Sequence, residues 1–198
     1  MRFIALEFRR ANQHDQSVCA VGTALFDNGK LIDSSRWSVK PPAGFDEFYA
    51  RFTAAHGITA SDVRNAPEFP EIAPDLFGRL ESADFVVVHE MELVLGVLLG
   101  LIEYFKLPCP EFRYICTLDV AFRLRSDLPT HSLTAMAEHL GHPVDRFHPP
   151  GEAIAVGRVL LSLFSLANPR AVRQLTNFAG PPRVPLEPIF LDPLTNIP

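Results

Sequence analysis

The chain has 198 residues, of which 47% are hydrophobic and 21% are charged, and these proportions fit one globular domain with a full core. Its net charge of −5 argues against a generally basic surface for nucleic acid, so any phosphate contact has to be local. The three cysteines form no CxxC pair, which argues against a zinc ribbon or a disulfide framework and favours a cytoplasmic location.

The first part of the chain predicts three antiparallel strands. Apolar and β-branched runs cover Phe3–Arg9, Ser17–Leu25 and Leu31–Val39. The sequence Asp27-Asn28-Gly29-Lys30 between the second and third runs is typical of a tight hairpin turn. A sheet that begins as a meander of three strands is therefore expected.

Strands and helices alternate in the remainder of the domain, which predicts an α/β fold with a mixed sheet. The most apolar segment, Met91 to Phe105, is too short to cross a membrane and carries two glutamates, so we expect a buried helix there. Strands are predicted at 85–88 and 112–117, and helices at 45–55, 59–63, 69–80, 92–105, 118–124, 133–140 and 152–166. Residues 1–167 form the predicted domain, and residues 168–198 a proline-rich C-terminal extension.

The first predicted strand carries charges in its second half. Because side chains alternate between the two faces of a strand, Glu7 and Arg9 share one face, opposite Leu6, Phe8 and Arg10. Unpaired charges are costly inside a fold. Glu7 and Arg9 therefore indicate either a site at the end of this strand or a strand that runs out into solvent.

Several short motifs stand in the order and spacing of a known family. These motifs are Phe3-Ile4-Ala5-Leu6-Glu7-Phe8, Ala11-Asn12, Gly22, Pro41-Pro42, His56-Gly57-Ile58, Val63, Ala66-Pro67, Phe69, Val86-Val87-Val88-His89, Cys116-Thr117-Leu118, His131-Ser132-Leu133, Leu140-Gly141 and Glu152-Ala153. With them the sequence resembles the DEDDh 3′–5′ exonucleases, which include ribonuclease T and the proofreading subunit of bacterial replicative polymerase. The resemblance covers about residues 3–167.

The resemblance implies a ribonuclease H-like fold, with a mixed five-stranded sheet flanked by helices. It also implies hydrolysis of phosphodiesters by two Mg²⁺ or Mn²⁺ ions, held by four carboxylates beside a general-base histidine. The first-strand Asp and Glu positions of the family hold Glu7 and Arg9 here. The second Asp position holds Val94, the histidine position Phe147, and the last acidic position Glu152.

These departures favour an exonuclease-fold protein that is catalytically degenerate and acts as a binding module for nucleic acid or protein. The guanidinium of Arg9 stays protonated and would repel a divalent cation at its position. Arg9 is the candidate phosphate-binding residue in a remodelled site. The alternative for Glu7 and Arg9 is a buried ion pair that preserves the fold after the chemistry is lost.

A second hypothesis is an active metal-dependent 3′–5′ exonuclease on single-stranded DNA or RNA with a shifted carboxylate set. Its metal ligands would be Glu7, Glu92 or Glu90, and Glu152, and its general base would be His148. The three later glutamates also have a simpler interpretation, because carboxylates are favourable in the first turn of a helix. For His148 the simpler interpretation, an ordinary loop residue, is favoured over the general base.

The resemblance implies two possible partners, single-stranded nucleic acid and, as in ribonuclease T, a second copy of the chain. The proline-rich residues 168–198 suggest a third, a protein partner bound through this extension. We expect no membrane association.

Overall fold

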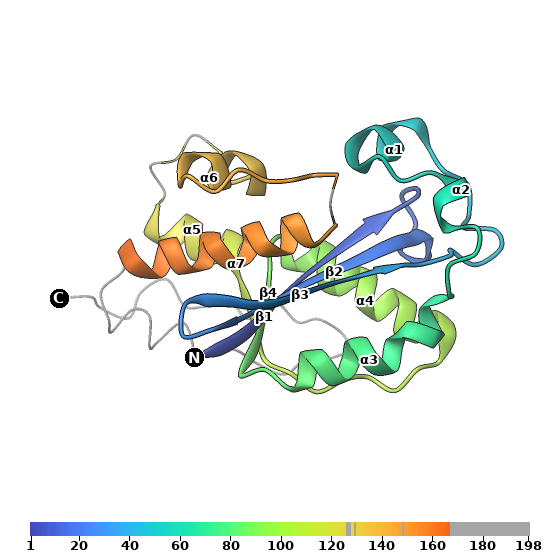
Figure 1. The fold of residues 1–198 in the computed structure, drawn as a ribbon, viewed down its shortest axis with the longest axis horizontal. Helices are drawn as coiled ribbons and strands as arrows, with labels where there is room; N and C mark the ends of the chain where they lie inside the picture. Colours follow the sequence, from blue (N-terminus) through green and yellow to red (C-terminus); the bar gives the residue numbers. More distant parts are fainter. Residues whose placement is uncertain (126–127, 129, 148, 167–198) are drawn as a thin grey trace.

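The computed structural model describes residues 1–125, 128, 130–147 and 149–166, and its centre is a five-stranded mixed sheet (Figure 1). The strand order is β3-β2-β1-β4-β5. β1 pairs antiparallel with β2, as β2 does with β3, whereas β4 is parallel to both β1 and β5. The strands are β1 (Arg2–Arg10), β2 (Val18–Asp27), β3 (Lys30–Ser38), β4 (Phe85–Val88) and β5 (Tyr114–Cys116). This is the predicted ribonuclease H-like architecture.

Helices cover both faces of the sheet. Figure 1 shows α5, α6 and α7 on one side, α3 and α4 on the other, and α1 with α2 beside one end of the strands. The helices are α1 (Ala50–His56), α2 (Ala60–Val63), α3 (Phe69–Glu81), α4 (Met91–Phe105), α5 (Thr117–Leu124), α6 (Leu133–His139) and α7 (Pro149–Leu166), with a 3₁₀ turn, η1 (Asp15–Ser17), between β1 and β2.

The alternation of side chains along β1 separates two hydrophobic cores. Ile4 and Leu6 belong to the core shared with α3 and α4, and Phe3 and Ala5 to the core shared with α7. Glu7 continues the face of Phe3 and Ala5, so it points towards the α7 side as the strand periodicity predicted.

Helix α7 packs closely across β1 and β2, and Gly157 makes this possible. A Cβ atom at Gly157 would lie 2.1 Å from Cε2 of Phe26, so only glycine fits there. This close approach holds α7 against the sheet. The first turn of α7, which carries Glu152, is thereby brought towards the end of β1.

Three predicted boundaries need correction. α1 begins at Ala50 and not at Phe45, because the backbone before it is held in extended form. Asn12 donates hydrogen bonds from Nδ2 to the carbonyls of Phe45 (3.0 Å) and Glu47 (2.7 Å), which fixes this segment to the β1–β2 loop.

The starts of β5 and α7 differ from their predicted starts by two and three residues. β5 is confined to Tyr114–Cys116, the residues that pair with β4, although a strand was predicted over 112–117. α7 begins at Pro149, before the predicted start at Glu152, because proline lacks the N–H that the first helical turn leaves unbonded anyway.

No helix in the described part of the chain has the length and apolarity that crossing a membrane would need. The apolar segment forms α4, whose residues Leu95, Leu98 and Leu101 lie in the core, as predicted. The C-terminal extension, residues 168–198, lies outside the described residues, so the division of the chain into domain and extension stays a prediction.

Candidate functional site

A largely buried ion pair joins the end of β1 to the start of α7. Arg9 Nη2 lies 2.5 Å from Oε1 of Glu152, and the two side chains are only 15% and 14% exposed. The same nitrogen donates a hydrogen bond of 3.2 Å to the carbonyl of Arg146, in the loop before α7. Arg9 therefore links three segments: the central strand, the last helix and the loop that precedes it.

Glu7 lies beside this pair in a different electrostatic state. Burial raises the pKa of Glu7 well above its ordinary value of 4.5, and the negative charge of Glu152 raises it further. The positive charge of Arg9 acts in the opposite direction without cancelling these effects. Arg9 and Glu152 form the charged pair, and Glu7 is a carboxyl group that resists ionisation.

The two glutamates around the start of α4 have different surroundings. The charge of Glu90 contributes to the raised pKa of Glu7, which places Glu90 within electrostatic reach of the site. Glu92 lies exposed in the first turn of α4, and its charge acts on Asp119 of α5. The structure thus brings Glu7, Arg9 and Glu152 together, with the exposed Glu90 near enough for its charge to act on Glu7, whereas the charge of Glu92 acts on Asp119.

Glu90 has a strained backbone. Its φ of 57° and ψ of 68° lie in the left-handed region, which costs a residue other than glycine about 1 kcal/mol, with asparagine among the best tolerated. In the described structure the Glu90 side chain does not cap α4. Strain at the join of a parallel strand and a helix, beside buried charges, is typical of functional sites.

We therefore expect Glu90→Asn to stabilise the protein by about 1 kcal/mol, because it relieves backbone strain and removes a negative charge near Glu7. Chemical denaturation at neutral pH measures this change. Glu92→Asn is the matched control two residues away. It removes a carboxylate that the helix N-terminus favours, so it should destabilise slightly. Equal effects of the two substitutions would contradict a specific strain at Glu90.

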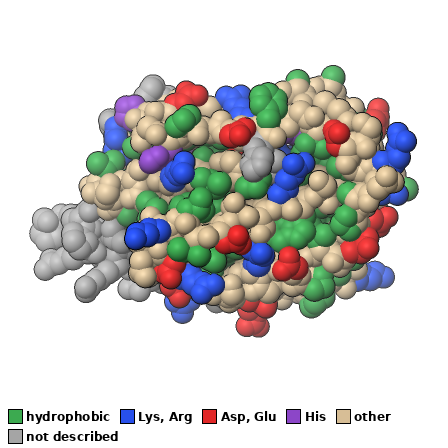
Figure 2. All heavy atoms as spheres, in the orientation of Figure 1, with side chains coloured by type: hydrophobic (Ala, Val, Ile, Leu, Met, Phe, Trp, Pro, Cys, Tyr) green, Lys and Arg blue, Asp and Glu red, His purple; other side chains and the backbone are tan. Residues whose placement is uncertain are grey.

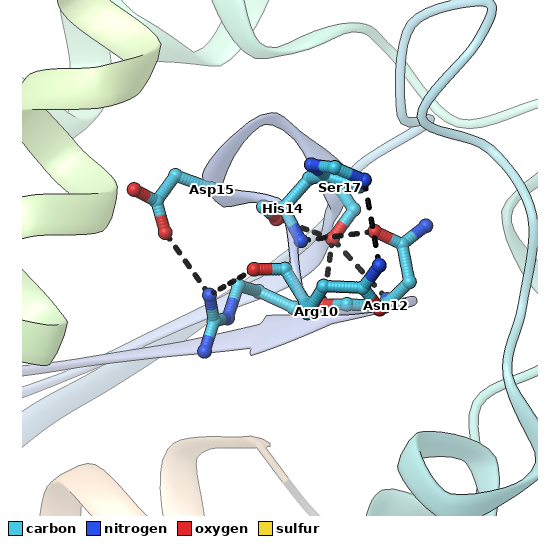
Figure 3. Close-up of polar contacts among 6 residues, drawn as sticks. Arg10, Asn12, His14, Asp15 and Ser17 are labelled. Carbon is cyan, nitrogen blue, oxygen red and sulfur yellow. Dashed lines mark hydrogen bonds and ion pairs between the residues drawn. The ribbon is translucent and has the colours of Figure 1, made fainter.

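The loop after β1 is fixed by a polar network that the sequence did not reveal (Figure 3). The Asn12 backbone N–H donates to Ser17 Oγ at 3.2 Å, and Ser17 Oγ lies 2.6 Å from the carbonyl of His14. Arg10 Nη1 binds Oδ1 of Asp15 at 3.0 Å, on the side of the strand away from Arg9. These contacts hold the chain rigidly just beyond the site.

His56 anchors α1 to the same place. Its Nδ1 accepts a 3.0 Å hydrogen bond from the Ile58 N–H, so Nε2 carries the proton and donates to the carbonyl of Arg10. Burial lowers the pKa of His56, and the nearby charge of Arg9 lowers it further. A neutral histidine thus tethers α1 to β1.

The residues of this site do not fit a divalent cation. Glu152 is engaged by a guanidinium, and the burial that raises the pKa of Glu7 works against the anionic form that a metal ligand needs. Among the described residues no group of three or more histidine, cysteine, aspartate or glutamate side chains is arranged to hold a metal ion. The arrangement supplies instead one fixed guanidinium, with acidic neighbours.

The remaining candidate positions are placed as follows. Val94 is buried in the core below the sheet, and Phe147 is exposed in the loop before α7. His148, the candidate general base, lies outside the described residues. The catalytic and metal-binding roles considered for Glu7, Glu92, Glu152 and His148 remain predictions, as does phosphate binding by Arg9.

Comparison with solved structures places the fold among nucleases. The nuclease domain of 3′hExo, a DEDDh family member bound to rAMP, aligns with a TM-score of 0.69 and 15% identity over 83% of this chain and 92% of that one. Exonuclease X in complex with 5′ overhanging duplex DNA aligns with a TM-score of 0.64 and 16% identity, over 88% of this chain and 99% of that one. Cell-death related nuclease 4 aligns with a TM-score of 0.71 and 14% identity, over 84% of this chain and 64% of that one.

The sequence gives independent support. No curated protein matches it closely enough to count as a relative. A family model described as exonuclease, of the ribonuclease T type, matches residues 3–149, which is most of the chain and includes β1, α4 and the loop before α7. The chain belongs to the exonuclease family of the ribonuclease T type.

Proposed function

We propose that this protein is a non-hydrolysing member of the exonuclease family that binds single-stranded nucleic acid. The observation that carries the proposal is the ion pair between Arg9 and Glu152. It places a permanent positive charge, already bonded to a carboxylate, among the acidic side chains at the end of β1. A two-metal mechanism tolerates few missing ligands, and a guanidinium beside the site repels the cations that this mechanism needs.

Nucleic acid is the favoured partner because of what similar proteins bind. Exonuclease X was solved with duplex DNA, and a 3′-exonuclease with a histone mRNA stem-loop aligns over 83% of this chain with a TM-score of 0.66. Arg9, with its planar fork of donors, is suited to phosphate oxygens when Glu152 releases it in part. The alternative is a protein partner or a second copy of the chain.

The surface charge limits how such binding works. Figure 2 shows positive and negative side chains interspersed on the face that it presents, without a continuous patch of either sign. The net charge of −5 agrees with this mixture. We therefore expect modest affinity that depends on a few contacts in the site, and not on general attraction of phosphates.

An assay of purified full-length protein with Mg²⁺ or Mn²⁺ tests the absence of hydrolysis. Single-stranded DNA and RNA oligonucleotides should stay intact while the same oligonucleotides, labelled with a fluorophore, show binding by anisotropy. Degradation that disappears in Glu7→Ala would overturn the proposal in favour of the shifted carboxylate set, whereas degradation that persists in Glu7→Ala would indicate a contaminating nuclease. Calorimetric titration should detect no binding of either metal at this site.

A further inference from the structure

The loop between α6 and α7 presents an aromatic ring to solvent at the rim of the site. Phe147 is 70% exposed, the highest value of any large hydrophobic side chain in the described residues. Two other exposed aromatic residues pack against neighbouring rings and are less exposed, at 44% for Tyr104 and 54% for Phe122. Tyr104 packs edge-on against Phe45, and Phe122 stacks on His131 with ring centroids 4.1 Å apart.

Phe147 has one backbone hydrogen bond and one close neighbour beside its ring. Its backbone N–H donates to Asp145 Oδ1 at 3.1 Å, and one edge of the ring rests on Gly57 at the end of α1. A Cβ atom at Gly57 would lie only 3.1 Å from Cδ1 of Phe147. Gly57 also has a positive φ of 75°, so both the space and the backbone conformation favour glycine at this position. One edge of the ring therefore lies against α1, and most of its surface is open to solvent.

The same loop is tied to the ion pair. The carbonyl of Arg146, the preceding residue, accepts the hydrogen bond from Arg9. Further along, Gly151 in α7 is so close to the loop that a Cβ atom would lie 2.4 Å from the carbonyl oxygen of Asp145. The exposed ring and two cationic residues, Arg9 and Arg146, are thus parts of one well-packed substructure.

We propose that Phe147 is a stacking platform for an unpaired nucleobase. This inference rests on the proposed function and names the residue that would give it a preference for single strands. Stacking of a base on an aromatic ring contributes about 1–3 kcal/mol and tolerates any base, because every base has an apolar face. Arg146, the exposed residue next to Phe147, can meet an adjoining phosphate, and the guanidinium of Arg9 binds the carbonyl of that same residue. A base within a duplex is already stacked and does not gain from this contact.

Binding of fluorescein-labelled single-stranded oligonucleotides to the full chain, at low ionic strength and with EDTA to exclude cleavage, tests the proposal. Phe147→Ala should weaken binding about tenfold, and Phe147→Tyr should retain it. Phe122→Ala, which removes another exposed aromatic residue, is the matched control and should stay within about twofold of the wild type. A blunt duplex of the same sequence should bind more weakly than the single strand and be insensitive to Phe147→Ala.

A fluorescence measurement provides a second readout. Trp37 is the only tryptophan of the chain, so Phe147→Trp adds one reporter at the rim, and the wild type supplies the background. Quenching of the added signal by the oligonucleotide would support stacking. Equal affinity of the wild type and Phe147→Ala would overturn the stacking proposal alone. Failure of the wild type to bind any oligonucleotide would overturn the proposed function as well.

Discussion

Replacing Arg9 by methionine is expected to destabilise the protein by about 3 kcal/mol at neutral pH. Methionine keeps most of the aliphatic volume but leaves the carboxylate of Glu152 without its partner in a largely buried place. Removing one member of a buried ion pair is far more costly than the net contribution of the pair, because the remaining charge stays desolvated. The pKa of Glu7 should rise further, since Arg9 is the charge that lowers it. Urea unfolding measures the change.

A double-mutant cycle separates the ion pair from other effects of the substitution. Adding Glu152→Gln to Arg9→Met should recover about half of the lost stability or more, because the stranded charge is then absent. The pair between Arg79 and Asp33 is the control. It lies on the surface with side chains 32% and 47% exposed, and its cycle should give a coupling below about 1 kcal/mol. Equal coupling in both cycles would contradict a special role for Arg9.

The path of the chain around the site was predictable in part. Strand periodicity correctly put Glu7 on the face opposite Leu6, because one face of β1 meets α7 and the other meets α3 and α4. The spacing of apolar residues in the second half of the chain predicted the alternation of helices and strands. Periodicity cannot pair residues as far apart in sequence as Arg9 and Glu152. Their placement in one site was predicted by the family resemblance, which assigns both to metal-ligand positions.

Other features depend on tertiary contacts that leave no local pattern. The left-handed backbone of Glu90 arises where β4 turns into α4, and glutamate gives no sign of it in the sequence. The start of α1 was misplaced because Asn12, in a distant loop, holds the preceding segment extended. The support of Phe147 by Gly57 likewise joins two segments that only the folded sheet brings together.

The protein should lose stability in mild acid, and His89 should be a principal cause. His89 is buried at the end of β4, with Nδ1 2.8 Å from Thr117 Oγ1, and burial lowers its pKa from 6.5 to about 4. The unfolded chain therefore takes up a proton between these two values that the folded protein does not. The resulting stability is fully present above pH 6.5 and is lost as the pH falls towards 4, by about 3 kcal/mol.

The comparison of two variants isolates this contribution from the other titrating groups. His56 acts in the same direction as His89, whereas Glu7, with its raised pKa, is stabilising at low pH and loses that effect as the pH rises. Because these groups are common to all variants, the difference in unfolding free energy between the wild type and His89→Gln should shrink by about 3 kcal/mol from pH 7.5 to 4. The exposed His14→Gln should follow the wild type throughout. Parallel curves for the wild type and His89→Gln would show that His89 does not carry the acid sensitivity.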